Sequence, residues 1–74
     1  GDVYKRQMRL PCAAMDTALR LLRPGGSFIV EHAESQVAAV AEALVGRGFT
    51  DVRLHHDLVG RPRATTAVLP GERS

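Results

Sequence analysis

The best candidates for acid–base chemistry in this sequence are Glu31 and His32, which are adjacent at the end of a short apolar run. A carboxylate and an imidazole can exchange protons with a substrate near neutral pH. Open α/β sheets bind their ligands at the carboxyl ends of strands, and the pair would lie there if the run is a strand. The same side chains can also act as structural hydrogen-bonding groups, so a catalytic and a structural interpretation are both open.

A second polar group contains ligand types found in metal sites. His55, His56 and Asp57 are consecutive, and His32 could join them. Neighbouring residues of a strand point to opposite faces, however, so His55 and His56 cannot easily bind one ion together. No spaced pair of His or Cys residues accompanies them. The sequence therefore predicts no metal-binding residue.

Cys12, Arg61 and Arg63 also have reactive or charged side chains. Cys12 is the only cysteine, which excludes an internal disulfide and fits a reducing cytoplasm. No His or acid is adjacent to it, so we interpret it as a small apolar residue and not as a nucleophile. Arg61 and Arg63 could hold a turn or contact an acidic partner, and we favour a solvated or turn-anchoring role.

The composition limits the class of protein. Seventy-four residues form one small domain at most, and the 45% apolar content is typical of a globular chain. The net charge is only +2, and basic residues alternate with acids, which favours a solvated surface over a nucleic-acid site. No apolar stretch reaches the roughly 18 residues of a membrane span, and the N-terminus lacks the apolar core of a signal peptide. We expect a cytoplasmic protein without a membrane partner.

Two helices are predicted from apolar spacing. The first covers about residues 12–22, with Pro11 near its first turn and Pro24 followed by Gly25-Gly26 as its stop. The second covers about residues 35–46, with Ser35 as N-cap and Gly46 or Gly48 as the left-handed residue after its end. The apolar stripes consist of Met15, Ala18, Leu19 and Leu22 in the first helix and Val37, Val40, Ala41, Leu44 and Val45 in the second.

Three strands are predicted around these helices. Residues 27–32 are apolar on both faces at their centre, which is typical of a strand buried in a parallel sheet. Residues 51–56 alternate, and residues 64–69 follow a turn at Gly60, so the last strand should be antiparallel to its predecessor. The order α–β–α–β–β predicts an incomplete three-layer α/β sandwich with an unpartnered sheet edge, and a frayed tail over residues 70–74. We expect the second helix to contact the sheet through Phe28, Val30, Val40, Leu44, Val52 and Leu54.

Residues 1–7 differ in composition from the rest of the chain. They contain its only Lys and only Tyr, whereas every basic residue after Met8 is Arg. Asp2 to Gln7 also resembles the translation of a transposon end used in DNA-library preparation. We therefore expect residues 1–7 to be a non-native segment and residues 8–69 to be part of one domain.

Four stretches together resemble a known family. They are Leu22-Arg23-Pro24-Gly25-Gly26 before the first strand, Glu31-His32 at its end, Gly48-Phe49-Thr50-Asp51-Val52, and Asp57-Leu58-Val59-Gly60-Arg61-Pro62-Arg63. This series is similar to the C-terminus of the bacterial release factor glutamine methyltransferases, which are class I S-adenosylmethionine-dependent enzymes. The resemblance covers about residues 18–66. Ala33, Pro62 and Ala64 depart from it: the family usually has Gly at the first position, and Asp and a β-branched residue are frequent at the other two.

The resemblance implies a fold and a reaction. The fold would be the C-terminal half of a Rossmann-like methyltransferase sheet. The reaction would transfer a methyl group from S-adenosylmethionine to the side-chain amide of a glutamine in the Gly-Gly-Gln loop of peptide chain release factors. The family binds the cofactor with a Gly-rich loop and an acid, and holds the amide with an Asn-Pro-Pro-Tyr motif. None of these occurs here, so no catalytic or cofactor-binding residue is assigned, and this chain alone is expected to be inactive.

The missing motif also favours the structural interpretation of Glu31 and His32, because the family's amide chemistry is assigned elsewhere. Two other functions stay open. The chain could be part of another class I methyltransferase that acts on a small molecule, RNA or protein. It could instead be a complete small α/β binding module without enzymatic activity.

Overall fold

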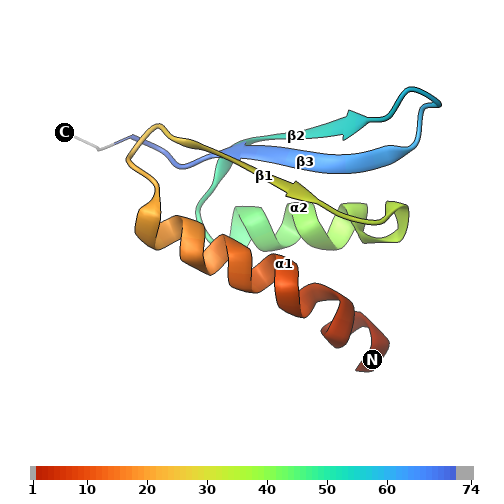
Figure 1. Cartoon of the computed structure of the whole chain (residues 1–74). Helices are drawn as coiled ribbons and strands as arrows, with labels where there is room; N and C mark the ends of the chain where they lie inside the picture. The colour runs from red at the N-terminus through yellow and green to blue at the C-terminus, as the bar shows by residue number, and fades with distance from the viewer. Residues whose placement is uncertain (1, 72–74) are drawn as a thin grey trace.

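The described part of the chain consists of two helices, a short 3-10 helix and three strands (Figure 1). The computed structural model describes residues 2–71, and for residues 2–6 it describes only the main chain. The elements are α1 (Asp2–Leu21), β1 (Ser27–Glu31), η1 (Glu34–Gln36), α2 (Val37–Gly46), β2 (Thr50–His56) and β3 (Pro62–Val68). Neither α-helix in this part of the chain combines the length and apolar content needed to cross a bilayer.

The strands form one sheet in the order β1-β3-β2. β3 is antiparallel to both neighbours, with Thr65 opposite Val30 on one side and Leu54 on the other. The predicted antiparallel last strand is confirmed. The prediction that β1 lies within a parallel sheet is wrong for the described residues, because β3 lies between the two parallel strands β1 and β2. The outer edge of β1 has no neighbour within residues 2–71.

Both helices lie on the same face of the sheet (Figure 1). α1 contacts α2 and β1, and α2 contacts β2 and β3. The described residues therefore form two layers, and the expected third layer is absent from them. Ile29 marks the open face: Val30 beside it is 8% exposed, whereas Ile29 is 60% exposed. Three apolar residues in a row indicated burial on both faces, but only one face of β1 is covered here.

The core lies between α2, α1 and the sheet. Val40, Leu44 and Met15 are completely buried, and Phe28 stacks on Phe49 with ring centroids 5.9 Å apart. The expected contact between the second helix and the sheet is confirmed at five positions: Val30, Val40 and Leu44 are buried, and Phe28 and Val52 pack against them. Leu54 was predicted to join this contact but is 38% exposed, because it lies towards the end of β2.

The first helix begins ten residues earlier than predicted, at Asp2, and contains Pro11 in its interior. Proline has no N–H to donate to the carbonyl four residues before it, which is that of Gln7. The side chain of Gln36 replaces this donor, with Nε2 2.9 Å from the Gln7 oxygen. This bond connects α1 to the start of α2. The side chains of residues 1–6 lie outside the described residues, so the non-native origin of residues 1–7 stays a prediction.

The ends of α2 also differ in part from the prediction. Gln36 is its N-cap, and Ser35 lies inside η1 and is not the cap. At the other end, Gly48 has a φ of 92°, while Gly46 is helical. The N–H of Phe49 donates to the Leu44 carbonyl and that of Gly48 to Val45, which is the Schellman pattern. The left-handed position predicted for Gly46 or Gly48 is therefore at Gly48.

Candidate functional site

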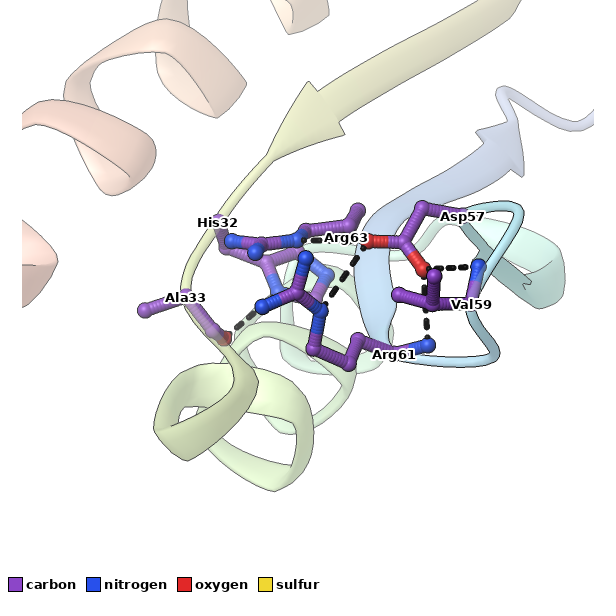
Figure 2. A network of polar contacts seen from close by, with 6 residues as sticks. All are labelled: His32, Ala33, Asp57, Val59, Arg61 and Arg63. Atoms are coloured by element: carbon purple, nitrogen blue, oxygen red, sulfur yellow. Dashed lines mark hydrogen bonds and ion pairs between the residues drawn. The ribbon is translucent and has the colours of Figure 1, made fainter.

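The topology brings the predicted polar residues to one end of the sheet. β1 and β2 run in the same direction, so His32 after β1 and Asp57 after β2 lie at the same sheet end. β3 begins at this end, and the carbonyl of its Arg63 accepts a hydrogen bond from the His32 N–H at 3.0 Å. A pocket of about 320 Å³ lies here, lined by Glu31, His32, Arg63 and Ala64. Figure 2 shows His32 and Arg63 at this end of the sheet, together with the Asp57 turn.

Both ring nitrogens of His32 are used in structural hydrogen bonds. Nδ1 lies 2.9 Å from the carbonyl oxygen of Ala33, and Nε2 lies 2.8 Å from Oγ1 of Thr65. A carbonyl can only accept, so Nδ1 carries the hydrogen and donates it. His32 is 9% exposed and Thr65 is 2% exposed. The imidazole therefore fastens the end of β1 to β3, which agrees with the structural interpretation of this residue.

Glu31 is not oriented as the partner of His32. Side chains alternate along β1, so Glu31 lies on the open face of the sheet while His32 lies on the face covered by the helices. Within the described residues, no hydrogen bond joins the two side chains. Glu31 and His32 therefore do not form an acid–base dyad in this arrangement.

Asp57 organises the turn between β2 and β3 (Figure 2). Its Oδ1 accepts hydrogen bonds from the main-chain N–H groups of Val59 and Arg61, at 3.0 and 2.9 Å. Gly60 has a φ of 87°, and its N–H donates to the Asp57 carbonyl at 2.9 Å. This is a type I turn followed by a left-handed glycine, in which Asp is favoured at the first position.

The two arginines share the second carboxylate oxygen. Nε of Arg61 is 3.3 Å from Oδ2 of Asp57, and Nε of Arg63 is 3.2 Å from the same atom. Both guanidinium groups remain about half exposed. The predicted turn-anchoring role of Arg61 and Arg63 agrees with these contacts. The group of three side chains has a net charge of +1.

The stability that the turn between β2 and β3 gives to the fold should depend on pH. The N–H of Arg61 is the main cause that lowers the pKa of Asp57 below its ordinary value, and bonds from Arg63 and Val59 act in the same direction. A carboxyl whose pKa is lowered by folding stabilises the fold above its unfolded pKa, and this contribution is lost as the pH falls through the folded pKa. We expect Asp57→Asn to melt at a lower temperature than the parent protein at pH 7, and this difference to shrink at pH 3.

Thermal melts of the complete protein by circular dichroism at the two pH values test this prediction. Asp16→Asn is the matched control, because Asp16 lies on α1 and forms a surface ion pair with Arg47. A melting difference for Asp57→Asn that stays constant from pH 7 to pH 3 would contradict it.

The remaining polar candidates do not extend this site. His55 bonds Oγ1 of Thr66 through Nε2 at 2.8 Å, on the open face of the sheet. His56 is exposed at the end of β2. Among residues 7–71, whose side chains the structure describes, no group of three metal-ligand side chains is close enough to hold an ion. Cys12 is half-buried on α1 and packs against the core as an apolar residue would.

The described residues do not fit S-adenosylmethionine. Gly25-Gly26 connects α1 to β1, so it is followed by a strand and offers no helix N-terminus to a ligand. A Cβ on Gly26 would lie 3.0 Å from the Arg23 carbonyl oxygen, so the space beside Gly26 is filled by its own turn. The connection from β1 to α2 contains no glycine. No cradle for the cofactor is formed by this part of the chain.

Curated bacterial proteins are similar to this chain. A protein named release factor glutamine methyltransferase from Mycolicibacterium smegmatis is 51% identical over 51 residues, which are 68% of this chain and 18% of that protein. The proteins of the same name from Streptomyces coelicolor and Mycobacterium leprae are 50% identical over 52 residues and 43% identical over 61 residues. This chain is a homologue of part of the release factor glutamine methyltransferases. It spans only about a fifth of their length, 18–21% in these three proteins.

The identity to these methyltransferases agrees with the family resemblance that the four stretches of the sequence indicated. No family model and no solved structure matches the chain significantly. The fold agrees with this relationship at the level of an α/β sheet covered by two helices. Sequence reasoning missed three features at the site. Thr65, 33 positions away, is the partner of His32, which no local motif reveals. Asp57, considered only as a metal ligand, caps the turn at which Leu58 and Val59 are exposed, and an Asp three residues before a Gly is the local signal for such a turn.

Proposed function

We propose that this chain is the C-terminal part of a cytoplasmic S-adenosylmethionine-dependent methyltransferase that methylates the glutamine side-chain amide of peptide chain release factors. The observation that carries the proposal is the 51% identity to a release factor glutamine methyltransferase over 68% of the chain. Identities of 43–51% in three organisms support the same assignment. The cofactor site and the reacting amide would be held by parts of the complete protein outside this chain.

The surface of the chain supports a role as part of a larger fold. The outer edge of β1 has no partner strand in the described residues, and the open face of the sheet exposes Ile29. An apolar pocket of about 460 Å³ lies between α1 and β1, lined by Ala14, Thr17, Ala18, Leu21, Leu22 and Phe28. An unpaired edge beside apolar surface favours further pairing. The chain would thus extend and support the sheet of the complete enzyme, and be inactive alone.

The DNA upstream of Met8 in the source genome tests the proposal without an assay. We expect an open reading frame that encodes a Gly-rich loop between a strand and a helix, and an Asn-Pro-Pro-Tyr segment closer to Met8. A Gly-rich loop without that segment would replace the proposal by another class I methyltransferase. A start codon with a ribosome-binding site directly before Met8 would instead support a small binding module and contradict the proposal.

A further inference from the structure

The turn between β2 and β3 has an apolar tip that its own fold does not use. The hairpin tip consists of Leu58, which is fully exposed, and Val59, which is 72% exposed. Hydrogen bonds hold the backbone of the hairpin tip in place. The Asp57 carboxylate accepts hydrogen bonds from the N–H groups of Val59 and Arg61, and the Gly60 N–H donates to the Asp57 carbonyl. A rigid loop that presents apolar side chains loses little conformational entropy when it binds a partner.

The position of the hairpin tip links it to the candidate site. It follows β2 at the same end of the sheet as the pocket beside Glu31 and His32, the end where open α/β sheets bind ligands. Figure 1 shows this turn at the end of the sheet that is remote from the C-terminus, beyond the helices. A hollow of about 270 Å³ lies beside it, lined by Asp57, Leu58, Val59 and Arg61.

The surroundings of the hairpin tip define the chemistry of its partner. Arg61 and Arg63 share the single carboxylate of Asp57, so a net positive charge borders the two apolar side chains. An apolar centre with a charged rim is typical of a protein interface. Single-stranded nucleic acids are held mainly by aromatic side chains that stack on bases, and residues 57–63 contain no aromatic residue. A polypeptide partner is therefore favoured over RNA.

We propose that the hairpin tip is a docking point for the protein substrate. Its occupant is a segment of the release factor in which an apolar side chain, seated on Leu58 and Val59, is flanked by a carboxylate that faces Arg61. This inference rests on the proposed function, because it takes the release factor as substrate. It assigns the hairpin a role in recognising the protein around the glutamine and none in the methyl transfer itself.

Leu58→Ser in the complete protein tests the docking point. With intact release factor as substrate, we expect kcat/KM to fall about tenfold or more, as for a central apolar contact of an interface. With a short peptide that contains only the Gly-Gly-Gln loop, kcat/KM should not change. Val45→Ser is the matched control: Val45 is 61% exposed on α2, and its variant should behave as the unmodified protein with both substrates. Arg61→Glu should weaken activity on the release factor only, and should make the remaining activity less sensitive to salt.

Other outcomes would overturn the docking proposal. An equal loss with both substrates, or a lowered melting temperature, would place Leu58 in a contact within the complete protein. A loss of RNA binding with unchanged release-factor kinetics would indicate a nucleic-acid surface. If the unmodified protein methylates neither substrate, the proposed function fails, and calorimetric titration of the protein with release factor still decides the docking point. Weaker binding by Leu58→Ser would then support it, and equal binding or no binding would overturn it.

Discussion

Replacing Leu44 with alanine in the complete protein is expected to lower the free energy of unfolding by about 2–5 kcal/mol. Leu44 is completely buried on α2, where it packs in the core with Val40 and Phe49. The truncation removes apolar contacts and leaves a cavity, because close-packed neighbours relax only in part. The adjacent elements α1 and β3 contribute to the same core, so local collapse of α2 cannot refill it easily.

Equilibrium unfolding in urea measures this effect. Val45→Ala is the matched control, because Val45 is the next residue of the same helix and is 61% exposed. Its substitution should change stability by no more than about 0.5 kcal/mol. Equal effects at the two positions would mean that the buried face of α2 has been assigned wrongly.

The complete protein is also expected to methylate the loop glutamine of a release factor, while the 74-residue chain gives no product. Methyl transfer needs the acceptor nitrogen held in line with the methyl group, and holding two reactants in place is worth many orders of magnitude in rate. The described residues form no cofactor cradle. They form no acid–base dyad either, because both ring nitrogens of His32 are hydrogen-bonded, to Ala33 and Thr65.

Mass spectrometry of the release factor after incubation with S-adenosylmethionine detects the added methyl group and its position. A release factor whose loop glutamine is replaced by alanine is the control and should stay unmodified. Product formed by the 74-residue chain, or a methyl group on any other residue, would contradict the proposed function.

Local patterns predicted the parts of this fold that depend on neighbours in sequence. The 3.6-residue spacing of Val40 and Leu44 placed both in the core, and both are completely buried. A left-handed glycine was predicted at position 46 or 48 and lies at Gly48, because left-handed backbone favours glycine, and the predicted turn at Gly60 is also present. In each case the physical cause lies within a few residues of the position.

The remaining features depend on groups far apart in the chain. Pairing across the sheet sets the strand order, which puts β3 between β1 and β2, and a period-two pattern does not specify the neighbour. Ile29 is exposed because no helix of the described residues covers its face, which its own apolar run could not reveal. Pro11 is tolerated inside α1, where a side chain 29 positions after Gln7 supplies a bond to the Gln7 carbonyl.

The candidate site shows the same division. The turn-anchoring role of Arg61 and Arg63 was predicted, and their partner Asp57 is at most six positions away, although its own capping role in the turn was not recognised. The structural role of His32 depends on Thr65, which is 33 residues away in the chain. The Thr65 hydroxyl is hydrogen-bonded to Nε2 of His32. Adjacent Glu31 and His32 suggested a pair, but strand geometry places their side chains on opposite faces.

Titration calorimetry with S-adenosylmethionine is the most direct test of the central claim, that this chain is part of a methyltransferase whose cofactor site lies elsewhere in the complete protein. The complete protein should bind the cofactor saturably, and the 74-residue chain should release no binding heat under the same conditions. A chain that starts at Met8 should behave as the 74-residue chain does. Saturable micromolar binding by both short chains would contradict the claim, because it would require a cofactor site within residues 8–74.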